Sequence, residues 1–168
     1  MDYLLGMNAK LYFGSAYAMT GEPPEWPEVD IEGDLDEIGN VKDLTLSLEA
    51  GEADITTREN SGWRATAPVL KEAQLEFEMQ WKPGDAAFEA VRDAYINGTT
   101  LALAALTEGP WVVPEPQGGP EATDAEGPVG NWSITNFSRN ESLEEAITVS
   151  VTAKLSAFVV WYGVAEEE

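Results

Sequence analysis

The chain has 168 residues, of which 31 are acidic and 9 are basic, so its formal net charge at pH 7 is −22. It contains neither cysteine nor histidine. These absences exclude disulfides, thiolate zinc sites and any catalytic arrangement that needs a cysteine nucleophile or a histidine base. The acidic composition also disfavours binding to nucleic acid and to anionic membranes. The composition therefore disfavours an enzyme, and we expect no catalytic residue, no cofactor and no metal.

The length and the 43% share of apolar residues are typical of one folded domain, and we expect residues 1–168 to form it. The first residues, MDYLLG, have neither the basic start nor the long apolar stretch of a signal peptide. No apolar run approaches the roughly 20 residues of a membrane span. We therefore expect the protein to be made in a cytoplasm.

The first predicted element is a strand over residues 7–13, in which apolar and polar residues alternate. Residues 20–37 hold eight acids, three prolines and no base, which predicts a solvated loop or arm. A calcium site is the alternative for this stretch. It is disfavoured because Gly33 precedes Asp34, out of register with a calcium-binding loop of the EF-hand type.

A second alternation, at residues 44–48, predicts another strand, with a turn-like break at 49–52 and an extended polar loop over 53–66. The clearest strand covers residues 74–81. Its apolar residues, which we expect to face the core, are Leu75, Phe77, Met79 and Trp81. Glutamine and glutamate occupy the alternate positions, so the other face of this strand is polar and acidic.

A helix is predicted over about residues 85–97, with Asp85 as its N-cap and Gly98 after its last turn. A strand over residues 100–106 follows. Residues 107–130 contain five prolines and five glycines, which predicts a long loop. Strand character returns in a short run at residues 132–134 and in an alternation at residues 147–155.

Three stretches resemble, in order and in spacing, the tail tube (major tail) proteins of long-tailed bacteriophages. They are NVKDLTLSLEAGEADITTR at residues 40–58, GWRA at residues 62–65 and SITNFSRNESLEEA at residues 133–146. With the strand at 76–81 and the helix after it, the resemblance covers about residues 38–106 and 131–156. Residues 20–37 and 107–130 do not match the family pattern, and we expect them to be insertions.

The resemblance implies a mostly-β fold, a two-sheet antiparallel β-sandwich or barrel with one flanking α-helix. It also implies a virion subunit that assembles with itself into stacked hexameric rings, which form a hollow conduit for DNA delivery. The implied partners are further copies of the chain and the tail terminator, tape measure and distal tail or baseplate proteins. DNA passes through such a tube without specific binding, and no membrane is involved.

The polar loop near residues 50–66 resembles a family segment that reaches toward neighbouring subunits. The resulting candidates for the subunit interface are Asp54, Thr57, Arg58, Asn60, Trp63, Arg64, Arg139 and Glu141. Arg58 and Arg64 are two of only nine bases, and we expect them to pair with acids of a neighbour. Glu76 and Glu78 share one strand face and are candidates to line the lumen, where an acidic wall would let DNA slide.

Two other functions are compatible with the sequence. One is the tube protein of a bacterial injection system, which would share the fold and carry effectors. The other is a carbohydrate-binding β-sandwich with exposed tryptophans such as Trp26 and Trp111. A sugar-binding module should remain monomeric, whereas a tube protein should form rings or tubes.

Overall fold

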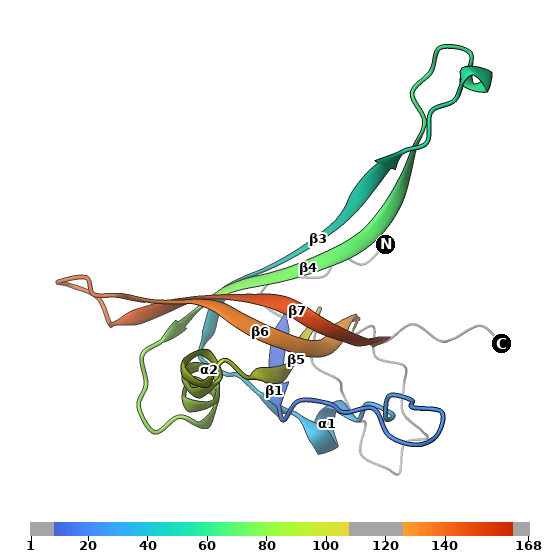
Figure 1. The fold of residues 1–168 in the computed structure, drawn as a ribbon. Helices are drawn as coiled ribbons and strands as arrows, with labels where there is room; N and C mark the ends of the chain where they lie inside the picture. The colour runs from blue at the N-terminus through green and yellow to red at the C-terminus, as the bar shows by residue number, and fades with distance from the viewer. Residues whose placement is uncertain (1–8, 108–125, 163–168) are drawn as a thin grey trace, which may run out of the picture.

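The structure is a computed structural model that describes residues 9–107 and 126–162. Within these residues, one antiparallel sheet of seven strands has the order β2-β1-β5-β6-β7-β4-β3 (Figure 1). The strands are β1 (Lys10–Gly14), β2 (Asp36–Glu37), β3 (Val41–Asp54), β4 (Thr66–Gln80), β5 (Thr100–Leu106), β6 (Gly127–Asn140) and β7 (Thr148–Tyr162). The helices are α1 (Ile31–Asp34), α2 (Ala86–Asn97) and a 3-10 turn, η2 (Arg58–Asn60).

The predicted mostly-β fold with one flanking helix is confirmed. The two-sheet detail is only partly confirmed, because the strands are hydrogen-bonded into a single sheet that does not close on itself. None of the helices in the described part of the chain is long and apolar enough to cross a membrane.

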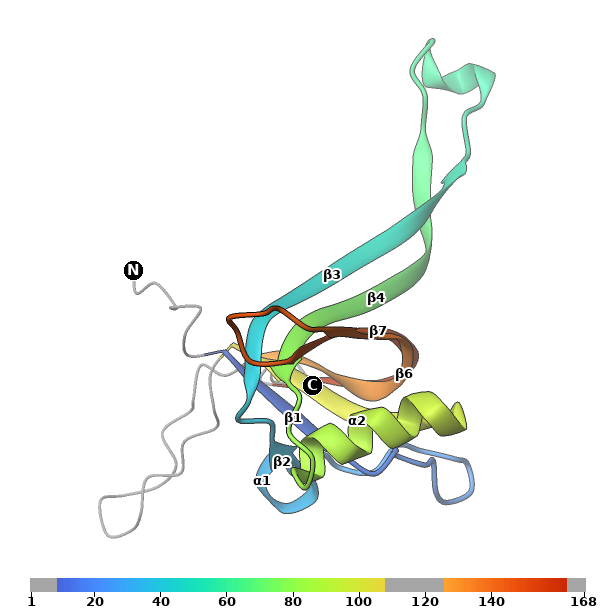
Figure 2. The same cartoon turned by 90° about the vertical axis from the view of Figure 1, so that its left-hand side faces the viewer.

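Helix α2 covers one face of the sheet and completes the main core (Figure 2). It begins where predicted, because the Asp85 carboxylate accepts a hydrogen bond from the backbone N–H of Phe88 at 3.3 Å. It ends at Gly98, whose φ of 64° is readily adopted by glycine. Phe88 and Val91 are fully buried against the sheet.

The predicted core-facing side of residues 74–81 is confirmed. Leu75, Phe77 and Met79 are buried, and Trp81 packs partly buried against the same cluster. The ring of Trp81 meets the ring of Phe88 edge to face, with the two centroids 4.8 Å apart. Trp81, the residue after β4, therefore links the helix to the main core.

Residues 20–37 are not simply a solvated arm. Ile31 and Leu35 are buried, and with Tyr12 of β1 they belong to a second apolar cluster on the other face of the sheet. Helix α1 brings Ile31 and Leu35 to that face, where they pack with Ala102 and Ala104 of β5. Ile31 and Leu35 were not predicted as core residues, because a helix of one turn is too short to give a periodic pattern and the stretch 20–37 contains eight acids.

Strand β6 is longer than the run predicted at 132–134, and it begins inside the predicted loop 107–130. Gly130 is required there by close packing, because a Cβ atom at this position would lie 2.5 Å from the carbonyl oxygen of Ala157. The next residue, Asn131, is buried, and its amide exchanges hydrogen bonds of 2.7 and 2.8 Å with the backbone of Tyr17. The remainder of the predicted loop, residues 108–125, lies outside the described residues.

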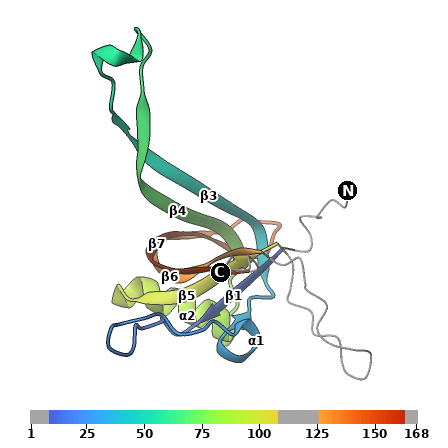
Figure 3. The ribbon, with the colours of Figure 1, turned by 90° about the vertical axis from the view of Figure 1, so that its right-hand side faces the viewer.

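The predicted polar loop over residues 53–66 is mostly the end of a long β-hairpin. Strands β3 and β4 pair from Val41↔Met79 to Asp54↔Thr66, and the hairpin rises away from the rest of the sheet (Figures 1 and 3). The predicted break at residues 49–52 lies inside β3, which continues to Asp54. A β-bulge occurs here, in which Gly51 alone stands opposite residues 69 and 70 of β4. The glycine and the acids around it resemble a turn in the sequence, although the strand continues through them.

Candidate assembly surface

The hairpin ends in a tip, residues 55–65, that is organised by its own hydrogen bonds. The backbone N–H of Ile55 and the hydroxyl of Thr56 donate to the carbonyl oxygen of Ala65, at 3.0 and 3.2 Å. The hydroxyl of Thr57 donates to the side-chain oxygen of Asn60 at 2.9 Å, and the N–H of Trp63 donates to the carbonyl oxygen of Asn60 at 3.0 Å. These hydrogen bonds give the tip a defined backbone conformation.

Three side chains project from this tip without a partner in the described part of the subunit. Arg58 and Arg64 are exposed and make neither a hydrogen bond nor an ion pair with any described residue. Trp63 is 79% exposed. All three line one shallow, open hollow on the tip. An exposed tryptophan between two free guanidinium groups is a composition enriched at binding hot spots.

Asp54 lies at the base of the tip. Hydrogen bonds from the side chain and the backbone N–H of Thr56 lower the pKa of its carboxyl group. Asp54 thus holds the start of the tip in place. Six of the predicted interface candidates are brought together on this hairpin end.

The other two interface candidates lie elsewhere, at the β6–β7 end of the sheet. Arg139 pairs with Glu141 at 2.7 Å, and its guanidinium lies 5.1 Å from the ring centre of Trp81. Both side chains are about half exposed and already have partners within the subunit. The structure therefore does not place them with the hairpin tip.

Glu76 and Glu78 lie on the face of β4 opposite its buried side chains. Their direct cross-strand partners are Thr45 and Lys42 on β3, and Thr152 and Ser150 on β7. The wider polar face formed by β3, β4, β7 and β6 carries mostly hydroxyl and amide groups. Its charged members are Lys42, Glu49, Glu72, Glu76, Glu78 and Lys154. The face is mildly acidic, with four carboxylates and two ammonium groups.

An apolar surface that was not predicted from the sequence lies between the β3–β4 and β6–β7 hairpins. Beyond Gln74↔Lys154, β4 separates from β7 (Figure 1). A groove of about 530 Å³ is lined by residues of both strands and of their neighbours. We call this the fork groove; its apolar lining comprises Leu48, Ala50, Ala73, Pro128, Leu155, Phe158 and Trp161. The available signal was the apolar run at residues 158–162, which is too short for a membrane span.

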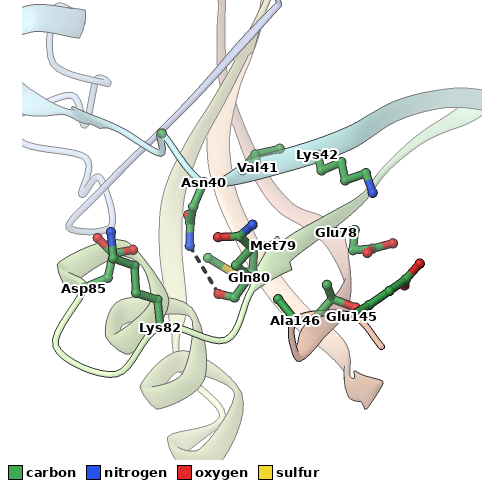
Figure 4. A pocket seen from close by; sticks show the side chains of 12 residues that line it. Asn40, Val41, Lys42, Glu78, Met79, Gln80, Lys82, Asp85, Glu145 and Ala146 are labelled. Atoms are coloured by element: carbon green, nitrogen blue, oxygen red, sulfur yellow. Dashed lines mark hydrogen bonds between the residues drawn. The ribbon is translucent and has the colours of Figure 1, made fainter. Parts of the chain in front are cut away.

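The described residues offer little support for a metal site or a carbohydrate-binding site. A hollow of about 800 Å³ at the opposite end of β3 and β4 is lined by mixed side chains, and Asn40 there donates to the carbonyl oxygen of Gln80 at 3.2 Å (Figure 4). No group of three or more acids that could hold a metal ion occurs in the described part of the chain. Trp26 is only partly exposed, and Trp111 lies outside the described residues.

Comparisons with known proteins agree on one family. The phage tail tube protein family matches residues 28–160. No curated protein sequence matches the chain.

The fold is similar to that of solved tail structures. The tail of an empty gene transfer agent particle, refined with C6 symmetry, aligns with a TM-score of 0.63 at 15% identity, covering 97% of this chain and all of the other. The SPP1 tail tube aligns at 0.61 and 17% identity, covering 95% and 77%. The native gene transfer agent virion aligns at 0.60 and 16% identity, covering 94% and 100%. Because the family match spans most of the sequence, the chain belongs to the phage tail tube protein family.

Proposed function

We propose that this chain is the repeating subunit of a virion tail tube, that it assembles with itself into stacked hexameric rings, and that the rings form a conduit for DNA. The observation that carries this proposal is the projecting β3–β4 hairpin, whose exposed tip has no partner in the described part of its own subunit. A projecting arm that exposes a tryptophan between two unpaired arginines has the composition of a protein-binding surface. A second subunit is the partner that self-assembly would bring to it.

The polar face of β3, β4, β7 and β6 is the surface we assign to the lumen. Its hydroxyl and amide groups offer no positive cluster to DNA phosphates, and its four carboxylates outnumber its two lysines. Phosphate binding needs basic side chains that release counterions from DNA. A face of this composition lets duplex DNA pass without holding it. Copies of this face around a ring multiply the same charge.

The opposite face carries α2 and the main core, and we assign it to the outside of the ring. The tail terminator, tape measure and distal tail or baseplate proteins are the further partners that a tube of this kind needs at its ends and in its lumen. The role is structural, and the proposal requires no catalytic group or cofactor.

The test is assembly of purified protein, followed by negative-stain microscopy and light scattering. The wild type should form tubes or rings, while Arg58→Glu should prevent them. The substitution replaces an exposed cation with an anion on a protein that already carries −22, so it repels the acidic neighbour. The melting temperature of the isolated subunit should stay nearly constant, because Arg58 has no partner among the described residues of that subunit.

The matched control is Lys82→Glu, which makes the same change of charge at an exposed lysine far from the tip. Tubes should form normally with this variant. Normal tubes from Arg58→Glu would remove the hairpin tip from the interface, and a strict monomer at high wild-type concentration would refute the assembly itself.

A further inference from the structure

The fork groove is an apolar surface flanked by two free strand edges. Within the described residues, β4 pairs with β7 only over Gln74–Gln80, so its segment 66–73 pairs with β3 alone. The segment 155–162 of β7 likewise pairs with β6 alone. Side chains of Leu48 and Phe158, each about half exposed, stand at the groove. Such a patch is a binding surface by its chemistry.

The charges around the groove are predominantly acidic. Glu49 and Glu72 are among its lining residues, and Glu126 accepts a hydrogen bond from the indole N–H of Trp161 at 2.6 Å. One base, Lys71, lies with them. An occupant that brings a large apolar side chain together with cations matches both properties of this site. In a chain with nine bases, few segments meet that description.

From these observations we propose that the fork groove receives the hairpin tip of a second copy of this chain, with Trp63 seated among the apolar side chains and Arg58 and Arg64 beside the carboxylates. The indole of Trp63 is 79% exposed on its own subunit. The groove volume of about 530 Å³ accommodates a side chain of this size. The inference rests on the proposed self-assembly and names its two contacting surfaces.

The tip cannot occupy the groove of its own subunit. The groove wall includes the Ala50↔Lys71 pair of the same hairpin, and Ile55 lies five positions beyond Ala50 along the extended strand. At about 3.3 Å per residue the tip begins about 16 Å beyond the groove. The paired strands between them prevent it from folding back. The contact is therefore between two different patches of two copies, which propagates into rings or stacks and does not stop at a dimer.

Cross-linking between two single-cysteine variants tests this contact, since the natural chain contains no cysteine. Glu59→Cys marks the tip without changing Trp63 or either arginine, and Lys71→Cys marks the groove without changing its apolar lining or its acids. The two variants are mixed, assembled into tubes and treated with a short bismaleimide. A cross-linked dimer of the two variants is expected.

The control replaces Lys71→Cys with Leu143→Cys, a fully exposed position in the β6–β7 turn, and should give no comparable dimer. Adding Trp63→Ala to the tip variant should raise the protein concentration needed for assembly at least about 30-fold, the effect of losing a hot-spot anchor.

Each other outcome contradicts the docking. Wild-type-like tubes with no cross-link at Lys71→Cys, or with equal cross-linking at Leu143→Cys, overturn the docking alone and leave the proposed function standing. Protection of Lys71→Cys from maleimide in the isolated subunit means that a segment of the same chain fills the groove, which also overturns it. Absence of tubes from the wild type overturns the proposed function and the docking together.

Discussion

Truncating Phe77 to alanine is the sharpest test of the sheet packing. Phe77 is 3% exposed, lies near the C-terminal end of β4 and is paired directly with Val151 of β7, which is itself buried. Removing a buried phenylalanine ring costs about 3–5 kcal/mol, because the apolar burial is lost and the cavity collapses only in part. A domain of this size has a total unfolding free energy of about 5–15 kcal/mol, so the variant should still fold while losing a large share of its stability.

Urea unfolding of the isolated subunit, followed by tryptophan fluorescence, measures this loss. Trp132 is fully buried and reports on the core. With a urea slope of about 2 kcal/mol/M, a loss of about 4 kcal/mol lowers the unfolding midpoint by about 2 M. Glu76→Ala is the matched control one position away on the exposed face of the same strand, and it should cost less than about 1 kcal/mol. A midpoint shift for Phe77→Ala no larger than the control's would refute the assignment of this face to the core.

Two further predictions concern the polar face and a buried hydroxyl. Replacing Glu76 and Glu78 with lysine should turn the mildly acidic face basic, so that assembled tubes retain duplex DNA in a salt-dependent manner; wild-type tubes that bind DNA equally at physiological salt would contradict the conduit assignment. Burial, with smaller contributions from the negative charges of Asp34 and Asp30, raises the pKa of Tyr17, whose hydroxyl is buried without a described hydrogen-bond partner. Because its folded pKa exceeds the unfolded value of about 10, the wild type should lose stability relative to Tyr17→Phe as the pH rises above about 10, and parallel pH profiles of unfolding would show that Tyr17 does not titrate in this way.

The sequence was most informative where a periodic pattern coincided with a local end signal. The helix was predicted at residues 85–97 and occurs at Ala86–Asn97. The prediction was accurate because the residues that cap and end the helix, Asp85 and Gly98, directly flank it in the sequence. The strand at residues 74–81 was predicted from its period of two, and the strand at residues 100–106 was predicted from its apolar run, which is buried on both faces of the sheet. The absence of histidine and cysteine likewise settled several classes of chemistry by residue type alone.

The tertiary structure decided what depends on partners distant in the chain. A glycine read as a loop residue, Gly130, belongs to a buried strand because the carbonyl of Ala157 approaches it. Ile31 and Leu35 are core residues because α1 meets the second face of the sheet, a meeting that acids nearby in sequence conceal. Residues 49–52 continue β3 because they pair with β4, although their sequence resembles a turn.

The same division applies to the candidate surface. The hairpin tip could be predicted as an interface candidate from its composition, because two arginines and a tryptophan occur together in a polar stretch of a chain with a net charge of −22. The fork groove was invisible, because Leu48 and Phe158 are more than a hundred positions apart and meet only where β4 leaves β7. A helix or strand can be predicted from the order of neighbouring side chains. The fork groove cannot, because it is formed by strands that are distant in the sequence and come together only in the folded sheet.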